Sequence, residues 1–380
     1  MDVVGTIVAF IAVIFILVLV HEFGHYVTAK LTGITVQEAG IGFPPRLASF
    51  TWRGTRYALN AIPLGGYVKM LGEDGEIEAD RMRERGMSDA AIDRAMAGAF
   101  NRKPIWIRIV VLAAGVAMNF LLAIVLFAAA LSLPAPALVG PLTVTTIQSD
   151  SPAQGRLQVG DRIVAADSHT FDDANGDFRF SGDLTSYVNQ HAGSPVTLTV
   201  ERDGKRVDVV VTPRVLTAEQ RQAGLGPVGF TWDASTVTVP ARAGNPVEAV
   251  SLGAQQTWQI AVQIPGALAD TVAGLVGLAP NTGEARGPIG IAQVTGEVIK
   301  EPLVSQLAFM GLLSVNLGVL NVLPFPPLDG GRLLVVVIEA VRRRRLPAER
   351  EALIYVTGFL VLMALVILIS IQDIARLPGS

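Results

Sequence analysis

The first 30 residues constrain the fold of this chain most strongly. No residue from Val3 to Val20 carries a charge, and a helix rising about 1.5 Å per residue over that length nearly crosses a hydrocarbon core of about 30 Å. The apolar run ends in His21-Glu22-Phe23-Gly24-His25. The run is long and only Asp2 precedes it with a charge, so we expect an uncleaved membrane-spanning helix over residues 1–32 rather than a signal peptide.

The five residues at the end of this run have the spacing of a metal site. His21 and His25 are four residues apart, so they share one face of a helix, and Glu22 lies beside them. This HExxH pattern is the arrangement in which zinc hydrolases hold a metal ion with two imidazoles and use the glutamate as a base. The alternative interpretation is a helix end at which His and Glu meet headgroups and water. Two of the chain's four histidines fall in this motif, which favours a functional site.

The composition excludes several classes of protein. With 51% hydrophobic and 17% charged residues and a mean hydropathy of +0.47, the chain is too apolar for an ordinary soluble enzyme and is predicted to be an integral membrane protein. A net charge of -3 without a long basic tract gives no reason to expect a nucleic-acid partner. Cysteine is absent, so a metal ion would have to be held by His, Asp or Glu.

Three later stretches have the length and composition of further spans: residues 104–135, 303–328 and 352–376. A fifth apolar stretch, Ala249 to Ala269, carries regularly spaced glutamines and Pro265. We therefore expect an interfacial amphipathic helix there, within a linker over residues 214–302.

The basic run Arg342 to Arg345 predicts the orientation of these spans. Under the positive-inside rule it places the segment of residues 329–351 in the cytoplasm. With four spans, both termini then lie outside, and His21, His25 and Asp329 come to one depth near the cytoplasmic side. The alternative role for Asp329 is the N-cap of the helix that follows it.

Residues 33–103 combine β-hairpin and helical signals. The glycine- and proline-rich first part predicts one or two hairpins with a turn near Arg53-Gly54, and the charged second part predicts a solvated helical linker. Irregular backbone lies at membrane depth only where protein or water covers it. A free strand edge beside the histidines could pair with an extended substrate segment, whereas the alternative is a plain surface hairpin.

Residues 136–213 have the pattern of a separate α+β module. Strands are expected at 143–147, 162–166, 196–201 and 206–212, with a helix from Gly182 to Ala192. The Ser151-Pro-Ala segment and Gly160-Asp-x-Ile163 resemble a bacterial PDZ domain. PDZ domains bind extended peptides, so this resemblance implies recognition or steric gating of a polypeptide by this module.

Several motifs together resemble the bacterial site-2 proteases, a family of intramembrane zinc metalloproteases, and within it the members with one PDZ domain. They are the HExxH motif, Gly65-Gly-Tyr-Val-Lys69, Asn119-Phe120, the PDZ-like module, Gly287-Pro-Ile-Gly-Ile291 and the segment from Asn321 to Leu328-Asp-Gly-Gly331. Two positions depart from the family pattern: Val116 stands where relatives often have Pro, and Arg332 where many have His.

The resemblance implies a role for individual residues. His21, His25 and Asp329 would hold zinc, and Glu22 would be the catalytic base. Asn321 would help to position the substrate near the metal, and we expect Asn316, Gly65 and Gly66 to take part in the same task.

The expected fold is an α-helical polytopic membrane protein with four transmembrane helices, a membrane-associated β-hairpin region and an inserted extracytoplasmic PDZ-like α+β domain. The resemblance implies the bacterial cytoplasmic (inner) membrane as its location. The implied substrates are single-span membrane proteins already shortened outside the membrane, such as anti-sigma factors or signal-peptide remnants. A peptide or a substrate ectodomain would meet the PDZ-like module.

Two other functions are compatible with parts of the sequence. A catalytically silent membrane adaptor could use a metal only as a structural staple, but a structural zinc site needs no base and has a fourth protein ligand. The other histidines, His169 and His191, lie in the PDZ-like module. A zinc transporter would need ligands in several spans, whereas residues 109–133 and 352–371 contain no His, Asp or Glu.

Overall fold

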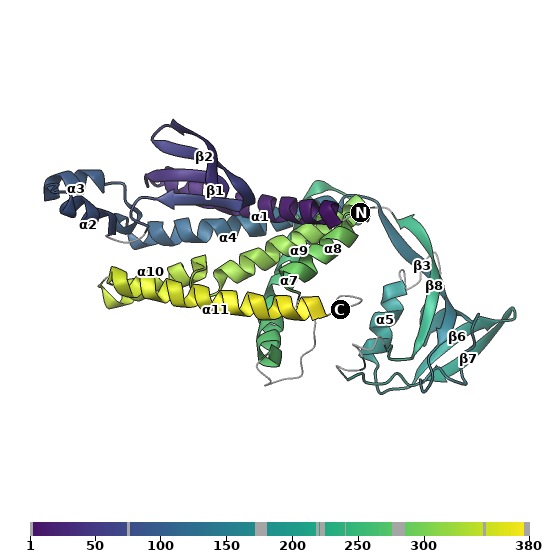
Figure 1. The fold of residues 1–380 in the computed structure, drawn as a ribbon. Coiled ribbons are helices and arrows are strands. Elements are labelled where there is room, and N and C mark those ends of the chain that lie inside the picture. Colours follow the sequence, from purple (N-terminus) through teal and green to yellow (C-terminus); the bar gives the residue numbers. More distant parts are fainter. Residues whose placement is uncertain are drawn as a thin grey trace. The chain divides into compact units, whose positions relative to one another are not determined.

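The computed structural model describes residues 3–73, 77–171, 181–217, 220, 225–239, 241–275, 286–344 and 347–375. The chain divides into two compact units (Figure 1). The first comprises Met1–Ser132, Arg242–Leu268 and Ala285–Ser380, and we call it the membrane unit. The second comprises Leu133–Ala241 and Ala269–Glu284, and we call it the β-rich unit.

Four helices of the membrane unit are long and apolar enough to cross a bilayer, as the sequence predicts. They are α1 (Val3–Leu31), α4 (Ile105–Leu131), α9 (Leu303–Val322) and α11 (Ala348–Ala375). Helix α9 ends six residues before the expected limit of the third span. Pro324, Pro326 and Pro327 follow it, and each lacks the N–H that would continue the helix.

Helix α4 contacts α1, α9 and α10 (Asp329–Arg342). A Cβ atom on Gly24 of α1 would lie 2.5 Å from the carbonyl oxygen of Ala114, so glycine permits the close approach of α1 and α4. On its other side, α4 packs Ala123 and Phe127 against Val315 and Val319 of α9. The helix that carries the HExxH motif is therefore held closely against α4.

Strands β1 (Val36–Trp52) and β2 (Thr55–Met70) form an antiparallel sheet. Arg53 and Gly54 both have positive φ, 47° and 77°, as a two-residue hairpin turn requires, and the predicted turn position is confirmed. Residues Glu38 to Ile41 each have two partners in β2, so this part of β1 lies between two arms of β2. Among the described pairings, the arm from Gly66 to Met70 pairs only with the start of β1, and its outer side is an open edge.

The segment after the hairpin has a small core of its own. Helices α2 (Ile77–Glu84) and α3 (Asp89–Ala95) and the short 3-10 helix η1 (Phe100–Arg102) follow β2. Leu71, Ala79, Ile92, Met96 and Ala99 pack together in this segment. The expected solvated linker is therefore a compact helical subdomain with its charged side chains on the outside.

Helices α7 (Pro246–Leu275) and α8 (Pro288–Val298) lie in the expected linker region. Helix α7 continues through Pro265, and it is not among the four candidate spans of the described residues. In the membrane unit its Ile260 and Ile264 pack against the cluster formed by α4 and α9. Its placement at the membrane surface stays a prediction.

The motif Gly287 to Ile291 forms the start of α8. Gly287 is the N-cap and Pro288 the first helical residue. The buried carboxylate of Asp373 on α11 accepts hydrogen bonds from the N–H groups of Gly287 (3.2 Å) and Gly290 (2.8 Å). Cβ atoms at both glycines would lie within about 3 Å of this carboxylate, so the motif lets α11 cap α8.

The β-rich unit contains a sheet in the order β7-β6-β4-β3-β8, and β5 pairs with β4. The strands are β3 (Ala135–Ile147), β4 (Arg162–Ala166), β5 (His169–Thr170), β6 (Val196–Arg202), β7 (Lys205–Val211) and β8 (Phe230–Val239), and the helix is α5 (Ser181–Gln190). Leu142, Ile163, Leu198 and Val211 lie in its buried core.

Strand β8 corrects the expected boundary of this module at Pro213. It pairs antiparallel with β3, from Ile147 opposite Phe230 to Ala135 opposite Val239. Phe230 and Trp232 pack against the buried core of the sheet, which is why a segment expected to be linker becomes a strand of the module.

Candidate metal centre

Helix α1 carries His21 and His25 on one face, in successive turns. Both side chains are buried, with 6% and 5% of their surface exposed. Their Nε2 atoms are 3.1 Å apart, so both rings present the same nitrogen to one point. The HExxH spacing thus produces two adjacent candidate ligands.

Asp329 reaches the same point from the other end of the sequence. Its Oδ2 lies 2.8 Å from Nε2 of His21 and 3.2 Å from Nε2 of His25. The residue is the first of α10; the N-cap is Leu328, so the carboxylate binds histidines instead of capping the helix. The two glycines that follow are required by close packing, because a Cβ on Gly330 would lie 2.2 Å from the carbonyl oxygen of Val322.

The dimensions of this group fit a zinc ion. Tetrahedral zinc with bonds of about 2.0–2.1 Å keeps its ligand atoms roughly 3.4 Å apart, and the three observed separations are slightly below that. Gly115 of α4 leaves room beside the nitrogens, since a Cβ there would lie 2.4 Å from Nε2 of His25 and 2.6 Å from Nε2 of His21. His21, His25 and Asp329 form the one group of three candidate ligands found among the described residues.

The far sides of the two rings are also bound. Nδ1 of His25 donates to the carbonyl oxygen of Val111 (2.8 Å), which leaves its Nε2 free to accept a metal. Nδ1 of His21 lies 3.1 Å from Nδ2 of Asn119, a fully buried residue of α4. Asn119 therefore contacts a neighbouring helix, and its partner there is a candidate ligand.

The Asp329 carboxyl stays ionised, as a metal ligand must. Burial alone would raise its pKa, but the hydrogen bonds with His21 and His25 outweigh burial and hold the pKa well below its usual value.

Glu22 lies half-buried beside this group, and its carboxylate interacts electrostatically with His25, His21 and Asp329. Gly65 and Gly66 of β2 pack on the same stretch of α1. A Cβ on Gly65 would lie 3.0 Å from Cγ1 of Val18, and one on Gly66 would lie 3.7 Å from Cγ of Glu22. The open edge of the hairpin therefore begins next to the proposed base.

The two amides of α9 are placed differently. Nδ2 of Asn316 donates to the carbonyl oxygen of Leu312 in its own helix (2.9 Å). Asn321 is half-buried on the last turn of α9, eight residues before Asp329. Among the described hydrogen bonds, neither side chain reaches the candidate ligands, and their positioning role stays a prediction.

An ion pair connects α10 to the end of the hairpin. Arg332, one turn after Asp329, pairs with Glu73, and its guanidinium lies 5.8 Å from the ring centroid of Tyr355 on α11. Glu73 also accepts the N–H of Met70 at 3.1 Å. The sequence showed Arg332 only as a departure from the family pattern, whereas the structure shows what it holds together.

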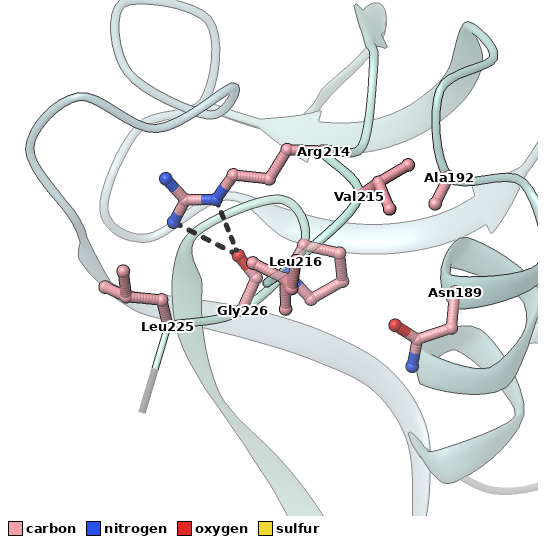
Figure 2. Close-up of a pocket in the computed structure, with 8 residues that line it drawn as sticks. Asn189, Ala192, Arg214, Val215, Leu216, Leu225 and Gly226 are labelled. Carbon is pink, nitrogen blue, oxygen red and sulfur yellow. Dashed lines mark hydrogen bonds between the residues drawn. The ribbon is translucent and has the colours of Figure 1, made fainter. Parts of the chain in front are cut away.

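The β-rich unit has a pocket of about 640 Å³ at the end of α5 (Figure 2). Arg214 lies over it, and its Nε and Nη2 each donate to the carbonyl oxygen of Gly226 at 3.3 Å. The lining residues are Asn189, Ala192, Arg214, Val215, Leu216, Leu225, Gly226 and Pro227.

Proteins similar to this chain over nearly its whole length are named as proteases. "Putative zinc metalloprotease Atu1380" of Agrobacterium fabrum is 32% identical, over 99% of this chain and 97% of that protein. "Regulator of sigma-W protease RasP" of Bacillus subtilis is 28% identical, over 98% of this chain and 99% of that protein. Among solved structures, a PDZ domain of a Listeria innocua protein matches 24% of this chain and 92% of its own, with 22% identity and a TM-score of 0.20.

The fold, the site and these relatives define a multi-pass membrane protein that is a zinc metalloprotease. The family model of Peptidase family M50 matches residues 9–365. The chain therefore belongs to this family, the site-2 proteases.

Proposed function

We propose that the protein hydrolyses peptide bonds within or near the transmembrane segment of single-span membrane proteins. The observation that carries this proposal is the group of His21, His25 and Asp329 with Glu22 beside it and an open strand edge next to Glu22. In it, the two histidines and Asp329 hold zinc and Glu22 is the general base. A silent adaptor would need neither the base nor the edge.

Zinc at this site would polarise the scissile carbonyl group and lower the pKa of a water molecule toward about 7. Glu22 takes the proton from the attacking water and passes it to the leaving amine. Asp329 would hold the ion through a carboxylate oxygen, since its Oδ2 lies beside Nε2 of both His21 and His25. Gly115 keeps the space at the ligand nitrogens free of side chains.

The hairpin edge presents the substrate in an extended form. A transmembrane helix uses its own carbonyl groups in hydrogen bonds, so it must unwind before hydrolysis. The arm from Gly66 to Met70 has an open outer side, and such a segment would add to the sheet there as a further strand. Because Gly66 lies against Glu22, the added strand passes the base.

The basic residues after α10 support a cytoplasmic position for this end of the spans, with both termini and the β-rich unit outside. We propose that substrates enter after a prior cleavage outside the membrane. The relative named regulator of sigma-W protease supports an anti-sigma factor as one substrate class. The pocket between α5 and Gly226 supports binding of a peptide or a substrate ectodomain.

The variant Glu22→Gln tests the catalytic role with little change in shape. Wild-type and variant protein, purified in detergent, are incubated with a tagged single-span substrate that has been shortened on its outer side. We expect cleavage to fall by at least about 100-fold in the variant. The zinc content should be unchanged, and Ser370→Ala, which removes a hydroxyl that bonds to Val366 of its own helix, serves as a control outside the ligand group. Undiminished cleavage by Glu22→Gln would remove Glu22 from its role.

A further inference from the structure

The amide of Asn119 is buried against a candidate zinc ligand, and half of it is unpaired. The residue has no exposed surface, and Nδ2 faces Nδ1 of His21 at 3.1 Å. Among the described residues, Oδ1 of Asn119 is a buried oxygen without a hydrogen-bond partner. Burying an oxygen without a hydrogen-bond partner costs free energy. This cost points to a second state in which Oδ1 accepts a hydrogen bond.

The observed orientation of the amide fits one tautomer of His21. Nδ2 is a donor, so Nδ1 of His21 accepts, and the ring proton is on Nε2. That proton points to Oδ2 of Asp329, 2.8 Å away. In this arrangement the ion-binding nitrogen is occupied by a proton, and His21 cannot serve as a zinc ligand through Nε2.

Zinc binding requires the other tautomer. When Nε2 gives its lone pair to a metal ion, the ring proton is on Nδ1 and needs an acceptor. Val111 supplies this acceptor to His25 permanently, because a backbone carbonyl can only accept. For His21 the acceptor must be the side chain of Asn119, and a rotation of its amide by about 180° brings Oδ1 to the position of Nδ2.

We propose that Asn119 is a positioning residue that exchanges donor for acceptor toward His21 and thereby sets the tautomer in which His21 binds zinc. The inference rests on the proposed ligand role of His21. Asparagine suits this task because it offers a donor and an acceptor at nearly the same place without a charge. Leucine has a similar size but offers neither, and aspartate offers only the acceptor.

Zinc affinity tests the proposal without reference to activity. The full-length protein is purified in detergent, and zinc is titrated in competition with a chelator of known affinity. We expect Asn119→Leu to bind zinc about 10- to 100-fold more weakly than the wild type. Asn119→Asp, which keeps the acceptor, should bind at least as tightly as the wild type.

Ser314→Ala is the matched control. Ser314 donates to the backbone oxygen of Asn119 at 2.7 Å, so this variant disturbs the same helix contact but leaves the amide in place. Its zinc affinity should equal that of the wild type. Equal zinc affinity of Asn119→Leu and the wild type, or equal weakening in both Asn119 variants, would overturn the proposal.

The ring protons can also be observed directly. The chain has only four histidines, so nitrogen-15 spectra of histidine-labelled protein contain few ring signals, and His21→Gln identifies those of His21. We expect the proton on Nε2 without zinc and on Nδ1 with zinc. A zinc-loaded protein with the His21 proton on Nε2 contradicts the proposal. If His25→Ala and Asp329→Ala both keep wild-type zinc affinity, the ligand set itself is wrong, which is a different failure.

Discussion

The two units of this protein differ in how many polar side chains they bury. In the β-rich unit, apolar residues such as Leu142 and Leu198 are inside, as in a water-soluble domain. In the membrane unit, only 11% of the most apolar stretch of α1 is buried inside the protein. In contrast, His21, Asn119 and Ser314 are nearly or fully buried. In lipid, polar groups gain most from being enclosed, and these three side chains lie between the helices at the metal centre.

The most damaging change to the membrane unit should be Gly115→Ala. The added Cβ would lie 2.4 Å and 2.6 Å from the two ligand nitrogens, so the histidines must move apart. We expect zinc binding to fall by more than about 100-fold, measured by chelator competition. Gly266→Ala is the control, since nothing lies within 4 Å of a Cβ at that position. Wild-type zinc affinity in Gly115→Ala would contradict the described packing.

Asp161 is a buried charge of the β-rich unit, and removing it should leave the metal centre unchanged. Asp161 is 1% exposed and accepts from Nε and Nη2 of Arg202 at 2.7 Å each. We expect Asp161→Asn to destabilise this unit by about 2 kcal/mol. Hydrogen exchange of β4 and β6 in the full-length protein measures this effect, and zinc content is the control. If Asp161→Asn leaves the hydrogen exchange of β4 and β6 unchanged, or if it loses zinc, the proposed independence of the two units is wrong.

The same carboxylate predicts a pH dependence. Burial alone would raise the pKa of Asp161, but Arg202 and the N–H of Gln158 outweigh it and hold the pKa below its usual value. Since the folded pKa lies below the unfolded value of about 3.9, this stabilisation is complete above that pH and is lost as the pH falls through the folded pKa. Exchange protection of the unit should therefore decrease below about pH 4. Asp161→Asn should show a smaller decrease.

A smaller effect is expected from the ion pair between Arg332 and Glu73. It holds the first turn of α10, and with it Asp329, against the end of the hairpin. We expect Arg332→Ala to weaken zinc binding about 10-fold through misplacement of Asp329. The exchanged pair Glu73→Arg with Arg332→Glu should recover part of the loss. No recovery would mean that Arg332 acts through Tyr355 instead.

The smallest effect should follow from Asp373→Ala. This change leaves two N–H groups at the start of α8 unpaired, so amide exchange in α8 should accelerate by roughly the equivalent of 1 kcal/mol. Ser370→Ala is the control on the same helix, because among the described hydrogen bonds Ser370 donates to Val366 of its own helix. Equal exchange in both variants would show that Asp373 does not cap α8.

The sequence was informative wherever a short motif or a long apolar run determined the local structure. The four long helices and the turn at Arg53 are of this kind, because length, composition and two turn residues suffice to predict them. Strand β8 was not predicted, since its partner β3 is more than 80 residues earlier and its own pattern is short. A pairing between distant segments is difficult to recognise from the sequence of either segment.

The same distinction applies within the metal centre. The spacing of His21 and His25 is a property of one helix, and the ligand role of Asp329 was implied by the family resemblance, in agreement with the predicted orientation of the spans. Gly115 and Asn119 have their roles only because α4 packs closely on α1. A glycine and an asparagine stand out in an apolar span, but the sequence does not identify the residues that they contact.

The zinc content of three purified proteins tests the central claim most directly. Elemental analysis should find about one zinc ion per chain in the wild type and in Glu22→Gln, since Glu22 is a base and not a ligand. Asp329→Ala should contain almost none after brief dialysis against a chelator. If Asp329→Ala retains as much zinc as the wild type, the carboxylate that joins the two ends of the sequence does not hold the metal, and the proposed mechanism is wrong.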